Sequence, residues 1–451
     1  MTHDPELARL GVYDARAPRY TSYPTAVQFT QGVGQSFVQA ALSSLPVDIP
    51  VSIYIHIPFC DRLCWFCACR TQGTKSASPV AAYLERVIAE IDLVAQHLPD
   101  GIKAGRIHWG GGTPTILTPD QITYLSTKLE KKIPRTKDAE FSVEIDPTLI
   151  SQAKIDALVQ AGMNRASIGV QDFALNVQKA IGREQSIETT KKCVDMLRRA
   201  NIESLNMDIL YGLPHQTRTS VLDTIHHVHA LSPDRIALYG YAHVPWMAKR
   251  QQLIDETALP DGEARHDLFQ LMSAELQRSG YAPIGIDHFA KTTDNMAVAN
   301  ENGQLRRNFQ GYTTDDMDTL IGLGASSISK YPSGYAQNAA KSSEYTRAID
   351  AGLLATYRGI ETSQTDRLIA RVIEMIMCNF KVDYPSLKTA FGDDLACLNK
   401  AMLYLQKQFG GIIVFSESGI EIMKHKRSIA RLVAKAFDQY IDDNAQFSAV
   451  S

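Results

Sequence analysis

From residue 51 onward, short apolar segments alternate with longer amphipathic ones. The apolar segments predict β-strands over residues 51–57, 106–109, 141–145, 165–170, 204–210 and 235–239. The amphipathic segments predict helices, for example over residues 80–97, 119–132, 152–161 and 187–200. Alternation of this kind is typical of parallel βαβ units. The pattern therefore predicts an α/β fold, arranged as a partial barrel or as a doubly wound sheet.

The two ends of the chain lack this alternation. Residues 1–36 are rich in turn-forming residues, which predicts an extended arm or lid. Beyond residue 330, helices are predicted over residues 364–380 and 426–441, with a β-hairpin over residues 411–415 and 420–423. We therefore predict three parts: an arm (1–36), an α/β domain (37–329) and a mainly helical, winged-helix-like domain (330–451).

Composition and charge argue against several classes of protein. Apolar residues make up 45% and charged residues 21%, as in ordinary globular chains. The net charge is −3, and the basic residues of the last domain form no stripe, which argues against nucleic-acid binding. We see no apolar run long enough for a membrane helix and no secretory signal pattern. We therefore expect a cytoplasmic protein, and we take a monomer as the starting assumption.

Four of the seven cysteines fall within ten residues, immediately after the first predicted strand: Cys60, Cys64, Cys67 and Cys69. A structural zinc site usually needs a second, separated pair of ligands, and the ferredoxin spacing begins C-x2-C, whereas here the spacing is C-x3-C-x2-C. Three thiolates on a four-iron cluster would leave one iron open, as a catalytic metal site requires. The cluster indicates metal or redox chemistry.

Polar and glycine residues recur where the other predicted strands end. Gly110, Gly111 and Gly112 follow the second strand and would let a ligand approach the backbone closely, although a tight turn explains them equally well. Glu144, Gln171 and Asp208 end later strands. Each alone would be explained as a helix cap, but their recurrence at successive strand ends favours one shared polar pocket.

The cysteine spacing, with Phe66 directly before Cys67, resembles the signature of the radical S-adenosylmethionine (SAM) superfamily. Within it, the chain resembles the oxygen-independent coproporphyrinogen III oxidases of anaerobic haem biosynthesis. The resemblance rests on segments along nearly the whole chain: residues 19–25 (RYTSYPT), 54–69 (YIHIPFCDRLCWFCAC), 109–115 (WGGGTPT), 169–173 (GVQDF), 211–214 (YGLP) and 308–314 (NFQGYTT).

This resemblance implies a partial (β/α)6 radical-SAM barrel, a four-iron, four-sulfur (4Fe-4S) cluster and SAM, with two SAM molecules per active site. It implies that coproporphyrinogen III loses carbon dioxide from two propionates, giving protoporphyrinogen IX. It also implies a one-electron reductant such as flavodoxin or ferredoxin. Four substrate carboxylates would need cationic partners, and the candidates are Arg16, Arg19, Lys249, Arg250, Arg306 and Arg307.

The resemblance also assigns residues. The implied cluster ligands are Cys60, Cys64 and Cys67. The implied SAM-binding residues are Tyr54, Phe66, Gly111, Gly112, Thr113, Glu144, Gln171, Arg183, Asp208, Ala242 and Ile328, the last facing the second SAM. The implied catalytic residues are Cys69, His56 and Gln310.

Cys69 separates this family from its relatives. The haem chaperones resemble the family but lack a cysteine two residues after the third ligand, so Cys69 favours the decarboxylase. A haem-modifying paralogue and a non-enzymatic cluster protein, such as a redox regulator, are the alternatives. Two positions depart from the family pattern: Ala68 and Lys426 stand where glycine is usual.

Overall fold

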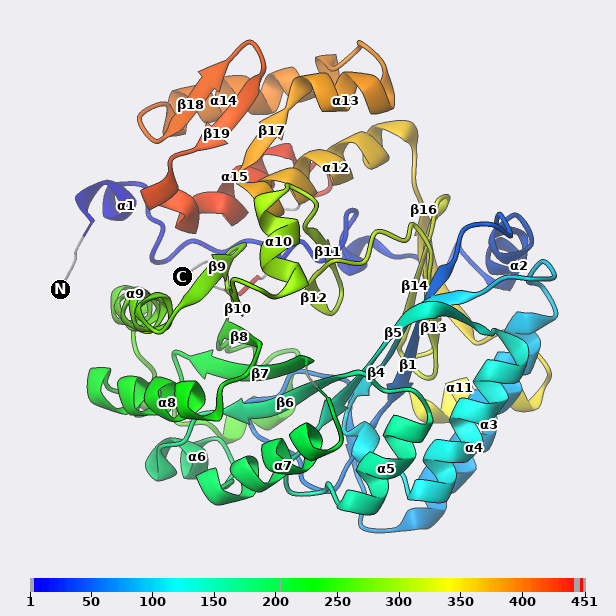
Figure 1. Ribbon diagram of the computed structural model, residues 1–451. Helices are drawn as coiled ribbons and strands as arrows, with labels where there is room; N and C mark the ends of the chain where they lie inside the picture. The colour runs from blue at the N-terminus through cyan, green and yellow to red at the C-terminus, as the bar shows by residue number, and fades with distance from the viewer. Residues whose placement is uncertain (1–3, 203, 442–446, 449–451) are drawn as a thin grey trace.

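The computed structural model describes residues 4–202, 204–441, 447 and 448, and its centre is a curved parallel sheet (Figure 1). The six predicted strands are confirmed: β1 (Val51–Ile57), β4 (Ala104–Gly111), β5 (Arg135–Ile145), β6 (Arg165–Gln171), β7 (Ser204–Tyr211) and β8 (Arg235–Gly240). They are neighbours in chain order, and β13 (Leu320–Leu323) pairs in parallel with β1.

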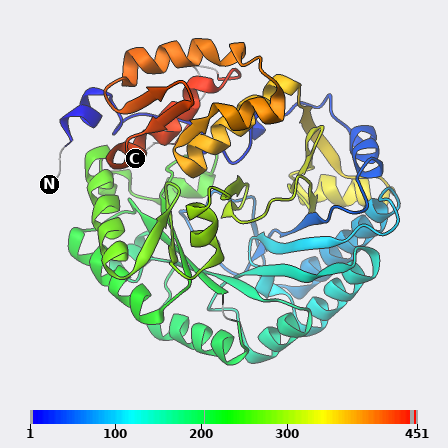
Figure 2. The ribbon, with the colours of Figure 1, turned by 45° about the horizontal axis from the view of Figure 1, so that its top comes forward.

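Helices surround the outside of this sheet, as the view along the barrel shows (Figure 2). They are α3 (Ala77–Ala95), α4 (Pro119–Lys132), α5 (Gln152–Gln160), α6 (Leu175–Ala180), α7 (Ile187–Arg199), α8 (Arg218–Leu231) and α9 (Gly262–Arg278). A doubly wound sheet would reverse its strand order and carry helices on both faces. Sequential strands with one outer layer of helices make this fold a partial barrel.

Antiparallel strands extend both edges of the barrel sheet. One edge continues through β14 (Ile328–Tyr331), β15 (Gly334–Asn338) and β16 (Thr356–Glu361), and the other through β10 (His288–Lys291) and β9 (Tyr281–Ile284). The predicted boundary at residue 330 therefore falls within β14. The boundary at residue 36 falls within α2 (Gln35–Ser43). The division into three domains stays a prediction.

Smaller elements connect these strands and helices. They are α1 (Pro5–Arg9), β2 (Phe59–Cys60), β3 (Gln72–Gly73), α10 (Asn295–Glu301), β11 (Arg306–Asn308), β12 (Gly311–Thr313) and α11 (Ser342–Asp350). Among the described residues, no helix is both long and apolar enough to span a membrane.

The last part of the chain, here called the C-terminal region, combines helices with a small sheet. It contains α12 (Gln364–Asn379), β17 (Lys381–Asp383), α13 (Tyr384–Phe391), α14 (Asn399–Phe409), β18 (Ile413–Ser416), β19 (Gly419–Ile422) and α15 (Ala430–Phe437). The predicted hairpin is confirmed as β18–β19. The helix predicted over residues 426–441 is too long, because Lys426 has a non-helical backbone and Asp438 is extended.

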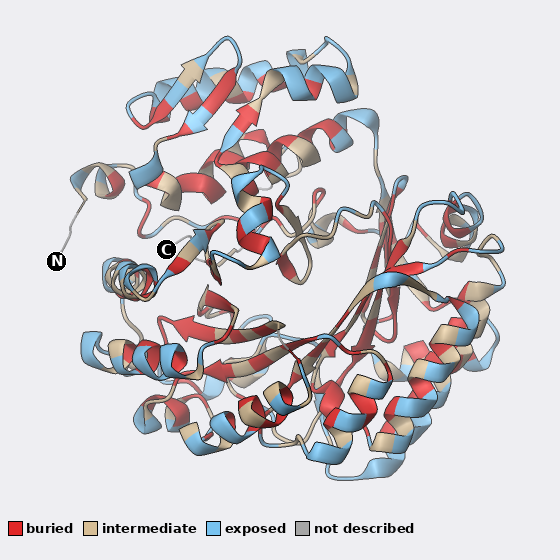
Figure 3. Ribbon diagram, in the orientation of Figure 1, coloured by how far each residue is buried: buried red, intermediate tan, exposed pale blue. Residues whose placement is uncertain are grey.

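Apolar side chains form two large cores. One lies between the barrel strands and their outer helices. The second joins the C-terminal region to the arm, whose Leu7, Val12, Tyr20 and Tyr23 are buried against α12 and α15. Figure 3 shows the buried faces of α12 and α15 turned inward and exposed residues on the outer helices. The arm thus packs between the barrel and the C-terminal region (Figure 1).

Candidate active site

The four clustered cysteines lie on one loop that is fastened at its base. The loop leaves β1 and returns through β3, which pairs in parallel with β2. The amide of Thr74 donates to the carbonyl of Cys60 (3.0 Å), and the amide of Trp65 donates to the carbonyl of Ile181 (2.9 Å). Short backbone contacts of this kind confine the loop to the carboxyl end of the barrel, where α/β barrels hold their active sites.

The thiols on this loop affect one another's ionisation. Burial raises the pKa of Cys60, and charge on Cys67 and Cys64 raises it further. A hydrogen bond from the Cys69 thiol lowers the pKa of Cys67 to about 6. Nη1 of Arg183 donates to Sγ of Cys64 (3.5 Å). The hydrogen bond from the neighbouring Cys69 thiol therefore favours negative charge on Cys67. Among the described residues, no three His, Cys, Asp or Glu side chains form a ready-made metal site.

The glycine turn after β4 lies directly against the start of this loop. The amide of Gly112 donates to the carbonyl of Ile57 (2.8 Å), and the amide of Thr113 donates to that of Phe59 (2.8 Å). A Cβ on Gly112 would lie 2.6 Å from the Phe59 carbonyl oxygen. Gly111 has φ +110°, and a Cβ there would strike the His56 ring. The glycines are therefore needed for close backbone contact, as the turn interpretation also required.

A cavity of about 820 Å³ occupies the inside of the barrel. Eight of the predicted site residues line it: Tyr54, His56, Cys69, Gly111, Glu144, Asp208, Gln310 and Ile328. They come from β1, the cysteine loop, β4, β5, β7, the β11–β12 connection and β14. The shared polar pocket expected from the strand ends is thus formed.

The remaining predicted residues lie around this cavity rather than in its lining. Cys60, Cys64 and Cys67 are in the cysteine loop, and Gly112 and Thr113 are in the glycine turn. Gln171 is a buried residue with φ 73° at the end of β6. Phe66 packs near Val177 and Ile181. Ala242 follows β8 and lines a separate small cavity.

The hydrogen bonds of Tyr54 and His56, both on β1, define which ring nitrogen of His56 carries the proton. Nε2 of His56 lies 3.2 Å from the carbonyl oxygen of Arg70, which can only accept a hydrogen bond. Nε2 therefore carries the proton, and Nδ1 accepts from the hydroxyl of Tyr54 (2.9 Å). Burial lowers the pKa of His56, so the ring is neutral near pH 7.

Two carboxyl groups that line the cavity have opposite pKa shifts. Burial opposes ionisation of Glu144, but hydrogen bonds from His108 (3.2 Å) and the Gly111 amide (3.0 Å) outweigh it and lower the pKa. Burial and the charge of Glu144 raise the pKa of Asp208 to about 6, although Asn206 and Ser167 donate hydrogen bonds to it. Such a divergent pair is typical of sites that hold and move protons.

Other polar residues at strand ends serve the structure. Asp172 accepts hydrogen bonds from the Ala174 amide, Gln216 and Thr224 but does not cap α6, whose N-cap is Ala174 with no side-chain bond. The buried side chain of Gln251 was missed: its Nε2 donates to the carbonyls of Phe66 (2.7 Å) and Ala242 (3.0 Å). Gln251 thereby joins two predicted SAM-binding positions, which no local sequence signal indicated.

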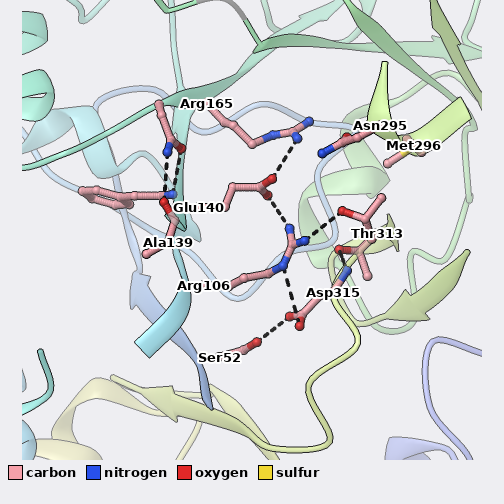
Figure 4. A network of polar contacts seen from close by, with 12 residues as sticks. Ser52, Arg106, Ala139, Glu140, Arg165, Asn295, Met296, Thr313 and Asp315 are labelled. Carbon is pink, nitrogen blue, oxygen red and sulfur yellow. Dashed lines mark hydrogen bonds and ion pairs between the residues drawn. The ribbon is translucent and has the colours of Figure 1, made fainter. Parts of the chain in front are cut away.

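An ion-pair network lines part of the central cavity (Figure 4). Arg106 and Arg165 each donate to Glu140, at 2.7 and 2.9 Å, and Arg106 also lies 3.7 Å from Asp315. Arg235 pairs with Asp294 at 2.7 Å. These arginines stand near the starts of β4, β6 and β8. Because each is paired with a carboxylate, these arginines add no net positive charge to the cavity lining.

The arginines predicted to bind substrate carboxylates have different partners in the structure. Arg250 donates to the carbonyl of Cys69 (3.2 Å) and to Thr71 (2.8 Å), which holds the cysteine loop. Arg306 pairs with Glu374 (2.8 Å), and Arg16 is exposed. Arg19 and Arg307 meet at the small cavity beside Ala242.

Known proteins resemble this chain along its whole length. It is 51% identical to the oxygen-independent coproporphyrinogen III oxidase of Cereibacter sphaeroides, covering 100% of both chains. It is 48% identical to that of Paracoccus denitrificans, covering 98% of both. The chain belongs to the oxygen-independent coproporphyrinogen III oxidase family. Residues 54–228 match the Radical SAM superfamily.

A solved structure supports the same assignment. Coproporphyrinogen III oxidase from Escherichia coli, described as a radical SAM enzyme, aligns with a TM-score of 0.90 at 36% identity, covering 94% of this chain and 98% of that one. The partial-barrel fold is thus shared. The chain is an oxidoreductase of anaerobic haem biosynthesis, and its cofactors are a 4Fe-4S cluster and SAM.

Proposed function

We propose that this enzyme oxidatively decarboxylates two propionates of coproporphyrinogen III to vinyl groups. The products would be protoporphyrinogen IX, two carbon dioxide, two methionine and two 5′-deoxyadenosine. The observation that carries the proposal is the central cavity, in which Cys69, His56 and Gln310 share one lining with the polar strand ends. The family relationship supplies the substrate class.

We propose that Cys60, Cys64 and Cys67 hold the iron–sulfur cluster. The donor set fits, because clusters of this type are ligated by thiolates and the three thiols lie on one short loop. Three ligands would leave one iron for SAM, and at Gly112 the glycine turn packs directly against the start of the cysteine loop. When bound, cluster and SAM supply a carbon radical that removes a hydrogen atom from the propionate carbon beside the pyrrole ring.

The chain's own residues would position the reactants and control protons. Tyr54 and His56 form a neutral, buried pair beside Glu144, and Gly111 is held by the ionised Glu144 carboxylate. Asp208, with a pKa of about 6, can hold a proton in the cavity near neutral pH. Ile328 lies in the same lining, which fits the proposed second SAM. The remaining proposed SAM contacts are Phe66, Thr113, Gln171, Arg183 and Ala242.

The arm would cover the bound substrate. Thr21 lines the central cavity, and the arm is fastened by bonds from Tyr20 to Asp438 (3.1 Å) and from the Gln439 amide to Tyr23 (3.0 Å). A covering arm would keep water away from a reactive intermediate. Deletion of residues 1–24 should therefore reduce decarboxylation, and undiminished activity would contradict the lid role.

We also propose the oligomeric state, the location and the electron donor of the enzyme. The enzyme would work as a monomer in the cytoplasm, without a membrane or nucleic acid, and would receive single electrons from a flavodoxin or ferredoxin. Neither the reductant nor the oligomeric state is needed for the test of the reaction.

The decisive experiment is anaerobic reconstitution with iron, sulfide, SAM, a reductant and coproporphyrinogen III. The proposal predicts vinyl product with two deoxyadenosines per substrate. Deoxyadenosine without vinyl product would favour a haem-modifying paralogue or chaperone. No SAM cleavage would favour a non-enzymatic cluster protein.

A further inference from the structure

Four arginines from distant parts of the chain meet at one small cavity outside the central one. Arg19 comes from the arm, Arg265 from α9, Arg307 from β11 and Arg431 from α15. The cavity measures about 70 Å³ and lies beyond the ends of β7 and β8, beneath the C-terminal region. We call this the arginine pocket.

Among the described residues, the lining of the arginine pocket holds four arginines and few acidic groups. Asp287 is the one carboxylate in the described lining, and it is bonded to Nδ1 of His288 (2.7 Å). Burial and the nearby charge of Arg19 lower the pKa of Arg431 to about 9. Burial also opposes the charge of Arg307, but Tyr312 and Asp287 outweigh it and raise the pKa of Arg307.

Several donors in the arginine pocket are buried without a partner. Nε of Arg265, and Nε and Nη1 of Arg307, have no hydrogen-bond acceptor among the residues that the structure describes. Other guanidinium nitrogens are fixed by carbonyls: Arg19 donates to Gly240 (2.9 Å), and Nη2 of Arg307 donates to Arg19 (3.3 Å). Arg265 and Arg307 therefore present donors to the pocket that no described residue accepts. Burying a donor without an acceptor costs free energy, and a bound anion that accepts these hydrogen bonds would remove that cost.

The size of the arginine pocket suits the end of a side chain rather than a ring system. A water needs about 10–15 Å³ by the same measure, so 70 Å³ admits a carboxylate but not a macrocycle. Arg307 also lines a neighbouring cavity of about 490 Å³. That cavity shares Thr21, Phe309 and Thr313 with the central cavity. A ring bound between these larger cavities would have Arg307 at its edge.

We propose that the arginine pocket binds one propionate carboxylate of the porphyrinogen while another propionate reacts. This inference rests on the proposed function, because it assigns part of that function's substrate. A planar guanidinium matches a carboxylate with two parallel hydrogen bonds, which fixes orientation as well as charge. The pocket would thereby set which face and which edge of the ring enter the central cavity.

The test uses the reconstituted holoenzyme and the variants Arg307→Gln, Arg265→Gln and Arg307→Lys, with Arg278→Gln as a control on the exposed face of α9. Loss of one charge-assisted pair should raise KM for coproporphyrinogen III about tenfold to a hundredfold, with kcat within about threefold. Arg307→Lys should recover part of this loss, and the control should match wild type.

A binding measurement separates carboxylate recognition from a structural role. Fluorescence titration should show weaker binding of coproporphyrin III to Arg307→Gln and Arg265→Gln, but unchanged binding of its tetramethyl ester. An equal loss for acid and ester, or an unchanged KM in both variants, would overturn the carboxylate pocket. A wild-type enzyme that made no vinyl product would overturn the proposed function and the pocket's role with it.

Discussion

Nη1 of Arg183 lies 3.5 Å from Sγ of Cys64, so a buried guanidinium donates to a proposed cluster ligand. The same side chain pairs with Asp146 at 3.5 Å and donates to the carbonyl of Gly169 at 2.9 Å. Donors to a ligating sulfur stabilise the more negative, reduced cluster and so raise its reduction potential. This contact links the strand-end residues to the redox chemistry.

Arg183→Gln should therefore shift the reduction potential of the cluster to more negative values and slow SAM cleavage by about tenfold. Redox titration followed by electron paramagnetic resonance measures the first effect. Arg62→Gln is the matched control, since Arg62 also approaches Asp146 (3.9 Å) but donates through Nη1 to the carbonyl of Glu184 (2.7 Å). An unchanged potential in Arg183→Gln would show that the contact does not tune the cluster.

Cys69 should be separable from the three proposed ligands. Cys60→Ser, Cys64→Ser and Cys67→Ser should each lower the iron content well below four per chain. Cys69→Ser should keep the iron but lose most vinyl product, because Cys69 lines the central cavity. Iron analysis and product chromatography measure these two effects. The control is Cys397→Ser, which changes an exposed cysteine outside the cysteine loop. Iron loss in Cys69→Ser would make Cys69 a ligand instead.

Gly112→Ala should abolish activity by displacing the backbone at the start of the cysteine loop. Its new Cβ would lie 2.6 Å from the Phe59 oxygen and 2.9 Å from the Ile57 oxygen, and backbone atoms cannot turn aside. We expect at least a hundredfold loss of product formation together with reduced iron. Gly34→Ala is the control, since no atom lies within 4 Å of its Cβ. Normal iron and activity in Gly112→Ala would contradict the packing argument.

Glu90 should make stability fall as pH rises toward neutrality. Its carboxyl is 2% exposed, and burial raises its pKa to about 7 despite donors from Tyr345, Gly324 and Asn338. The folded protein thus binds this proton more tightly than the unfolded chain, so the unfolding free energy should decrease between about pH 4.5 and 7, by about 3 kcal/mol.

Urea unfolding across this pH range tests the Glu90 effect. Glu90→Gln should flatten the decline, while Glu85→Gln on the exposed side of α3 should leave it intact. An identical slope in wild type and Glu90→Gln would assign the pH dependence to other groups.

Lys426, which departs from the family pattern, should fasten the first turn of the arm. Its buried ammonium donates to Asp4 (2.6 Å) and pairs with Glu6 (3.0 Å). Lys426→Met should cost about 1–2 kcal/mol and speed hydrogen exchange in α1. The exposed Lys424→Met is the control. Unchanged exchange in Lys426→Met would show that apolar packing alone holds the arm.

Local patterns accounted for the parts of the fold and site that are built from adjacent residues. The apolar strands and the cysteine loop could be predicted because each is encoded within ten or so residues. The short β13 and the antiparallel β14–β16 gave no comparable signal, because their stability comes from pairing with an existing sheet edge. Likewise, the pairing of Arg106 and Arg165 with Glu140 depends on strand register, which periodicity does not encode.

The arginine pocket shows the same limit most clearly. Arg19 and Arg307 were among many cationic candidates, whereas Arg265 and Arg431 carried no signal at all. Only the tertiary fold reveals that one candidate pairs with Glu374 while another has donors that no described residue accepts.

The arm's contacts with the far end of the chain have a consequence for biosynthesis. Arg431 donates to the carbonyl of Pro18 (3.1 Å), and the Ala17 amide donates to Ser448 (3.4 Å). The residues of the arm are therefore synthesised before the residues that bind them. The barrel strands are therefore made before the residues that hold the arm, and the arm can dock only after the C-terminal region has been made.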